Sequence, residues 1–228
     1  MTILTRDKLI DGSFRSGLKM PSHLSWSEAD IERSLGETLR ARPAGAIWVF
    51  AYGSLMWNPL LAFDEQRTAT LDGWQRSFCV RSISGRGSPE RPGRILALEP
   101  GGRGQGVALR LNDDQAASEL RLLWTREMSS GDYHPIWAPL ALDDGREVAA
   151  IVFVINPEQP LYESDATVAT VARIVADAAG VFGPNADYIH ALDAALADRG
   201  LRDPYVDAIV GELKRCQDAT TRNKERFK

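Results

Sequence analysis

The sequence predicts an α+β fold: a small mixed β-barrel that carries one inserted helix and is followed by C-terminal helices. Three observations predict it. Between residues 46 and 155, apolar side chains gather into six or seven short runs that are typical of strands. One stretch in that region repeats its apolar residues at helical spacing instead. From residue 164 onward the apolar spacing is helical.

A helical extension is expected ahead of the barrel, over residues 1–45. Ser27 can cap a helix there, because its hydroxyl can accept an unpaired main-chain N–H of the first turn. Ile31, Leu35 and Leu39 then recur at helical spacing and form one apolar face. Proline and glycine in the segment 42–45 end the pattern.

The strand candidates of the barrel start with a nearly continuous apolar run over residues 47–52, which is typical of a strand buried on both faces. Residues 143–145, Asp-Asp-Gly, are a strong hairpin signal between the last two candidates. The glycine-rich segment 101–106 is followed by a strand instead of a helix, so it predicts a hairpin loop and not a dinucleotide site. The remaining candidates are residues 67–71, 77–81, 95–98, 106–111, 136–142 and 147–155.

The inserted helix follows residue 111. Asn112 or Asp113 can cap it, since either side chain can accept an N–H of the first turn. Its expected apolar stripe consists of Ala117, Leu120, Leu123 and Trp124.

Three C-terminal helices are expected. The first starts at Ser164 and ends at Gly180, and the second is capped by Asn185. The third opens with Asp203-Pro204, in the usual order of cap and then proline. Residues 46–215 therefore form one domain, and residues 216–228 form a charged tail.

Composition excludes several classes of protein. The chain carries 27 basic and 31 acidic residues, a net charge of −4, which disfavours general nucleic-acid binding. No apolar run approaches the roughly 20 residues that a membrane span needs, and residues 1–8 lack the apolar core of a signal peptide. Two distant cysteines and three separated histidines predict neither a disulfide framework nor a metal site. We therefore expect a cytoplasmic protein.

The first strand candidate ends in the turn Tyr52-Gly53-Ser54-Leu55. A glycine directly after a buried strand lets the chain turn sharply and lets a ligand approach the main chain. Exposed N–H groups in such a turn can bind a carboxylate or stabilise a developing oxyanion. Taken alone, the motif fits a plain tight turn equally well.

Glu127 lies at the end of the inserted helix, where the helix dipole disfavours negative charge. Arg126 beside it can compensate that charge. In apolar surroundings the carboxyl would have a raised pKa and suit general acid–base catalysis. Composition alone favours the alternative, a solvated ion pair between Arg126 and Glu127 on the surface.

Arginines gather in a loop rich in glycine and proline: Arg81, Arg86, Arg91 and Arg94. The loop can bind an anionic ligand. As a nucleic-acid surface it is short and lacks interleaved aromatic residues, so a solvated loop is the default expectation.

Together these motifs resemble the ChaC family of γ-glutamylcyclotransferases. Their order and number make the likeness specific, and it covers about residues 46–200. The segments that carry it are residues 48–59, 73–74, 78–79, 85–87, 92–94, 124–128, 162–165 and 185–188.

The resemblance implies a γ-glutamylcyclotransferase-like barrel that cleaves glutathione to 5-oxoproline and cysteinylglycine without metal or cofactor. It implies that Glu127 is the catalytic acid and base. Ala51 stands where family members usually have glycine, which removes some backbone freedom. The residues implied to cradle the γ-glutamyl group are Phe50, Ala51, Tyr52, Gly53, Ser54 and Leu55.

Two alternatives stay open at this point. One is a cyclotransferase that acts on other γ-glutamyl amino acids or amines. The other is a catalytically idle module that binds γ-glutamyl compounds, against which the presence of Glu127 beside an intact turn argues. The expected partner is the small molecule glutathione, with no nucleic acid and no membrane.

Overall fold

The computed structural model describes residues 4–226, and side chains up to residue 217. Within these residues, five strands close into a barrel in the order β1-β3-β2-β4-β5. This confirms the predicted α+β barrel. The strands are β1 (Trp48–Ala51), β2 (Phe63–Ser82), β3 (Gly93–Leu111), β4 (Tyr133–Leu142) and β5 (Glu147–Ile155).

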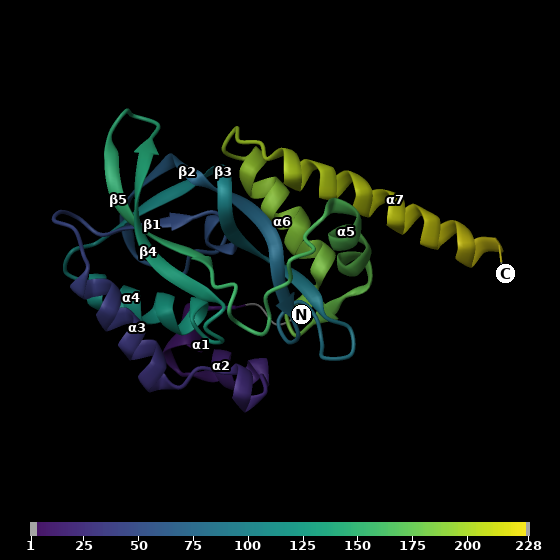
Figure 1. Ribbon diagram of the computed structural model, residues 1–228, viewed down its shortest axis with the longest axis horizontal. Coiled ribbons are helices and arrows are strands. Elements are labelled where there is room, and N and C mark those ends of the chain that lie inside the picture. Colours follow the sequence, from purple (N-terminus) through teal and green to yellow (C-terminus); the bar gives the residue numbers. More distant parts are fainter. Residues whose placement is uncertain (1–3, 227–228) are drawn as a thin grey trace.

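The helices lie in two groups on different sides of the barrel (Figure 1). One group is α1 (Arg6–Ile10), α2 (Ser13–Leu18), η1 (Ser22–Leu24), α3 (Glu28–Arg40) and α4 (Ala116–Glu127). The other is α5 (Val168–Asp177), α6 (Asn185–Ala197) and α7 (Pro204–Arg226). Two short segments complete the fold: the one-turn helix η2 (Ser54–Met56) after β1, and the hairpin β6 (Ala179–Gly180) and β7 (Gly183–Pro184).

Four of the predicted strands are parts of two long ones, β2 and β3, and the predicted hairpin loop at residues 101–106 is wrong. Those residues lie inside β3 and pair with β2, with Thr70 opposite Gln105 and Asp72 opposite Arg103. The register shifts between Asp72 and Trp74, where Gly73 has φ 83° and the partner strand carries Gly101 and Gly102 with φ 119° and 61°. Such a bulge bends the ladder without ending it.

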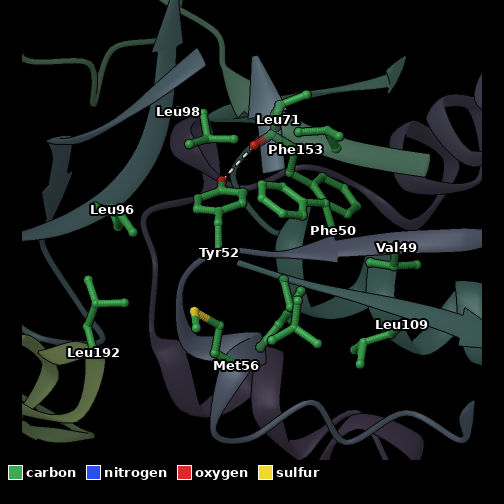
Figure 2. Packing of buried hydrophobic residues seen from close by; sticks show 14 of the residues in the cluster. Val49, Phe50, Tyr52, Met56, Leu71, Leu96, Leu98, Leu109, Phe153 and Leu192 are labelled. Atoms are coloured by element: carbon green, nitrogen blue, oxygen red, sulfur yellow. Dashed lines mark hydrogen bonds between the residues drawn. The ribbon is translucent and has the colours of Figure 1, made fainter. Parts of the chain in front are cut away.

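The position of strand β1 in the barrel explains its continuous apolar sequence. All four of its residues are buried, and it lies between two neighbours, antiparallel to β3 and parallel to β5. Figure 2 shows part of the core beside it, where the rings of Phe50, Tyr52 and Phe153 come together. The Tyr52 hydroxyl donates a hydrogen bond of 2.6 Å to the main-chain oxygen of Phe153. The strand end is therefore fixed to the neighbouring strand β5.

The start of α4 differs from the prediction. Neither Asn112 nor Asp113 caps it: the helix begins after Gln115, and the Asn112 amide binds Asp64 instead, at 3.1 Å. The predicted stripe is confirmed at Leu120, Leu123 and Trp124 but not at Ala117, which is exposed. Ala116 and Glu119 take the remaining buried positions of the helix.

The C-terminal helices are confirmed with shifted ends, but the predicted Asn185 cap is wrong. Asn185 is the first residue of α6, and its side chain hydrogen-bonds the Arg94 main chain instead. Helix α5 starts after Thr167, because the Asp165 carboxylate accepts the Thr167 N–H and holds the preceding residues in a turn. Asp203 caps α7 by accepting the main-chain N–H groups of Tyr205 and Val206, as predicted. Since α7 continues to Arg226, the expected charged tail begins within it. Residues 227–228 and the side chains after residue 217 lie outside the described part.

The predicted helix of the N-terminal segment is α3, and Ser27 caps it with a full capping box. Helices α1 and α2 were not predicted. Their buried residues Leu9, Phe14 and Leu18 form a hydrophobic cluster separate from the barrel core. No described helix has the combination of length and apolar character that crossing a membrane requires.

Candidate active site

Two adjoining cavities lie where the turn after β1 meets the end of α4. The large cavity has a volume of about 490 Å³, and the small cavity about 30 Å³. Four residues line both of them: Ser54, Glu127, Tyr133 and Tyr188. We call this set the catalytic wall. A pocket of several hundred Å³ with convergent polar groups is the size that small ligands occupy.

The turn after β1 approaches Tyr188 so closely that a side chain would not fit easily between them. A Cβ placed on Gly53 would lie 3.2 Å from the Tyr188 hydroxyl and 3.5 Å from Leu96 Cδ2. Gly53 has a negative φ of −128°, so the position needs glycine for space and not for a left-handed backbone. The N–H of Met56 donates to the Gly53 oxygen at 2.8 Å and closes the turn into η2.

Arg76 supports the turn from inside the protein. Its Nε donates to the Tyr52 main-chain oxygen at 2.9 Å, and its Nη1 donates to the Asp203 carboxylate at 3.0 Å. Burial lowers the pKa of this guanidinium, and the charge of Asp203 opposes that effect. Since a buried guanidinium is tolerated when acceptors surround its N–H groups, Arg76 fixes the Tyr52 carbonyl and with it the turn. Sequence reasoning gave Arg76 no role.

Glu127 ends α4 and is 16% exposed. Its Oε1 lies 3.1 Å from Arg126 Nε, an ion pair outside hydrogen-bond geometry, and no described residue gives this buried oxygen a hydrogen bond. Burial raises the pKa of Glu127, and the Arg126 charge partly offsets the rise. Both side chains are largely buried, so the solvated surface pair is excluded. The result is a carboxyl with a raised pKa at the junction of the two cavities.

Arg126 connects the end of α4 to the turn. Its Nη2 donates to Ser54 Oγ at 2.8 Å, and its Nη1 donates to the main-chain oxygens of Asn58 and Pro59 at 2.5 and 3.2 Å. The predicted compensation of the Glu127 charge is therefore only part of its contribution. The same guanidinium also sets the position of Ser54 relative to Glu127.

Tyr133 and Tyr188 complete the catalytic wall. The Tyr133 hydroxyl donates to the Leu96 oxygen at 2.8 Å, and the Tyr188 ring packs edge-on against Trp57 at 5.4 Å. Burial raises the pKa of both phenols, so they are neutral at physiological pH. Sequence reasoning missed them as site residues, although Tyr188 lies in one of the segments that carry the family resemblance.

The structure brings together Glu127 and most of the predicted cradle. Tyr52, Gly53, Ser54 and Leu55 line the small cavity beside Glu127. The other cradle residues, Phe50 and Ala51, are fully buried in β1 and line neither cavity.

The arginine loop connects β2 to β3, and two of the four arginines predicted to lie in it belong to the strands, Arg81 to β2 and Arg94 to β3. Arg81 and Arg86 line the large cavity, whereas Arg91 is exposed. Arg94 is buried, with its Nη2 3.3 Å from the Glu163 carboxylate. In the described residues, no three His, Cys, Asp or Glu side chains form a group that could hold a metal ion.

Comparison with known proteins identifies the family. Residues 47–216 match the family model described as ChaC-like protein. This chain belongs to the ChaC-like family. The glutathione-specific gamma-glutamylcyclotransferase of Escherichia coli K12 is 44% identical over 93% of each chain. Gamma-glutamylcyclotransferase 2-3 of Arabidopsis thaliana is 27% identical over 74% of this chain and 89% of its own.

A solved structure shares the fold of this ChaC-like protein. It is the crystal structure of a γ-glutamyl cyclotransferase specific to glutathione from yeast, with a TM-score of 0.70 at 20% sequence identity. The match covers 76% of this chain and 97% of the yeast chain. At this identity, the likeness shows that the γ-glutamyl cyclotransferase barrel is the fold of this protein.

Proposed function

We propose that this chain is a glutathione-specific γ-glutamylcyclotransferase, a carbon–nitrogen lyase that releases 5-oxoproline and cysteinylglycine. The observation that carries the proposal is the place of Glu127, a largely buried carboxyl with a raised pKa at the junction of the two cavities. The name of the Escherichia coli relative supports the choice of glutathione, because that protein aligns with 93% of this chain at 44% identity.

The reaction is an intramolecular displacement. The α-amino nitrogen of the γ-glutamyl group attacks the γ-carbonyl carbon of the same group, and a five-membered lactam closes. The bond from that carbon to the cysteine nitrogen breaks, so no water is consumed. A site that holds the folded conformer removes much of the entropic barrier of the attack.

Glu127 moves the proton in this scheme. Its carboxylate accepts a proton from the substrate's α-ammonium group, which frees the nitrogen lone pair for attack. The resulting carboxylic acid then protonates the departing cysteine nitrogen. As the lactam forms, the attacking nitrogen loses a second proton, which also passes to the cysteine nitrogen, so cysteinylglycine leaves with an ammonium group. A glutamate with a raised pKa suits both steps, because general acid–base catalysis is most efficient when the pKa lies near the working pH.

The turn after β1 is the proposed cradle of the γ-glutamyl group. Gly53 and Ser54 line the small cavity together with Glu127. In the proposal, their main-chain N–H groups hold the developing oxyanion or the α-carboxylate. Tyr52 and Leu55 line the same cavity. Phe50 and Ala51 line neither cavity, so in the proposal they support the turn from β1 and do not contact the substrate. A cytoplasmic location remains a prediction from the sequence.

The test is incubation of the purified protein with glutathione and, separately, with γ-Glu-Ala, followed by chromatography for 5-oxoproline. We expect 5-oxoproline and cysteinylglycine in equal amounts from glutathione, and little product from γ-Glu-Ala. Product from γ-Glu-Ala alone would replace the proposal with a cyclotransferase for other γ-glutamyl compounds. No product from either would leave a γ-glutamyl-binding module.

A further inference from the structure

Part of the large cavity is built from residues outside the family domain. Leu4, Phe14, Leu18 and Met20 line it, yet the family match begins at residue 47. Phe182, in the turn between β6 and β7, joins them through a stacked contact with Phe14, with ring centroids 6.2 Å apart. We call these five residues the N-terminal wall.

The N-terminal wall and the catalytic wall belong to different parts of the protein interior. Phe14, Leu18 and Phe182 pack in the separate hydrophobic cluster of α1 and α2, whereas Tyr188 packs in the barrel core. Arg86 bridges the two walls. Its guanidinium carbon lies 5.9 Å from the centre of the Tyr188 ring, and its Nη1 donates to the Phe182 oxygen at 2.7 Å.

The N-terminal segment is fastened to the domain by specific contacts. Arg6 makes two hydrogen bonds to Glu119, of 2.5 and 2.7 Å, and Glu119 is 1% exposed. The Asn58 amide donates to the Leu4 oxygen at 3.2 Å, and the Ser84 hydroxyl donates to the Leu18 oxygen. Asn58 and Ser84 also line the large cavity. The wall is therefore held in place by its neighbours on both the turn and the arginine loop.

The scissile bond divides the substrate between the two cavities. The γ-glutamyl part must lie at Glu127 and the turn, and the small cavity of about 30 Å³ has no room for a dipeptide as well. The leaving group must then extend into the large cavity. The apolar N-terminal wall, Arg81 and Arg86 all line that cavity.

We infer that the N-terminal wall is the subsite for the leaving dipeptide and makes residues 4–20 a specificity determinant of the enzyme. The cysteine side chain packs on Phe14, Leu18 and Met20, and the glycine carboxylate faces the arginines. An apolar surface favours a small uncharged side chain at this position over a charged one. The inference rests on the proposed function, since it assigns a binding site to cysteinylglycine, the part of glutathione that the turn does not hold.

The test compares Phe14→Ala and Met20→Ala with the wild type in the full-length protein. Ile10→Ala is the matched control, because Ile10 lies in the same segment, is 64% exposed and does not line the large cavity. We expect KM for glutathione to rise about tenfold in Phe14→Ala and less in Met20→Ala, with kcat within about twofold. Inhibition by cysteinylglycine should weaken in parallel, whereas inhibition by 5-oxoproline should not change.

The possible results distinguish failure of this inference from failure of the proposed function. If the wild type releases no 5-oxoproline from glutathione, the proposed function fails. If it does, and both variants keep the wild-type KM and wild-type inhibition by cysteinylglycine, the inference alone is wrong. Equal loss of inhibition by both products also contradicts it, because the whole site would then have been disturbed. Met20→Ala decides the question if Phe14→Ala melts at a lower temperature than the wild type, since Met20 is only half-buried.

Discussion

The two walls of the large cavity differ in how they are built. Buried arginines support the catalytic side through hydrogen bonds to main-chain oxygens: Arg76 at Tyr52, and Arg126 at Asn58 and Pro59. The N-terminal wall is apolar, and four of its five residues precede the family match. All of its residues except Met20 pack in a cluster separate from the barrel core. The difference indicates a division of labour. In the proposed mechanism, buried charges position the groups that react, and the apolar wall selects the leaving group.

Glu127→Gln is the substitution with the largest expected effect, and it changes the catalytic wall but not the N-terminal wall. Glutamine has nearly the same shape but cannot carry a proton, so we expect kcat to fall by about 10² to 10⁴-fold with little change in KM. The loss should be the same for glutathione and for any slower γ-glutamyl substrate, because both use the same proton path. Steady-state kinetics on each substrate measure it.

The control for that change is Glu158→Gln, since Glu158 is exposed and lines neither cavity. It should keep wild-type kinetics. A Glu127→Gln protein with wild-type kcat would remove Glu127 from the mechanism.

Gly53→Ala tests the catalytic wall with a smaller expected effect. The added methyl group would lie 3.2 Å from the Tyr188 hydroxyl, at the edge of the small cavity. We expect kcat/KM for glutathione to fall by about 10 to 100-fold, because small displacements of a reacting group are costly, and Gly53→Val should lose more. Gly211→Ala on α7, where a Cβ meets nothing within 4 Å, should behave as the wild type. Unchanged kinetics in Gly53→Val would overturn the cradle.

The smallest expected effect is on stability. The pKa of Glu127 is higher in the folded protein than its ordinary value, so the folded state binds the proton more tightly than the unfolded state does. This contribution is fully present below the unfolded value of about 4.3 and is lost as pH rises through the folded value. The unfolding free energy of Glu127→Gln minus that of the wild type should therefore increase with pH across this window. Urea titrations at several pH values measure it, and a constant difference from about pH 4 to about pH 8 would contradict the raised pKa.

Local patterns in the sequence indicated the turn and Glu127 as candidates, but taken alone they fitted a plain turn equally well and favoured a surface ion pair. The apolar run of β1, the glycine that follows it and the carboxylate at the end of α4 are each visible within a few residues. The family resemblance added that the turn and Glu127 act together. The structure places both at the small cavity.

Long-range contacts explain what the sequence did not predict. The length of β2 and β3 depends on pairing across a bulge at Gly73, which no local pattern shows. Helices α1 and α2 have five and six residues, too few for a periodic apolar face. Arg76 and Tyr188 are distant in sequence from Glu127, and their burial follows only from the closed barrel and α6.

The pH dependence of kcat/KM for glutathione tests the central claim most directly, since Glu127 must be ionised to accept the substrate's proton. The account predicts that activity falls on the acidic side with an apparent pKa above the ordinary glutamate value of about 4.3. The residual activity of Glu127→Gln should lack this acidic limb. An acidic limb at or below the ordinary value, or the same limb in the variant, would contradict the account.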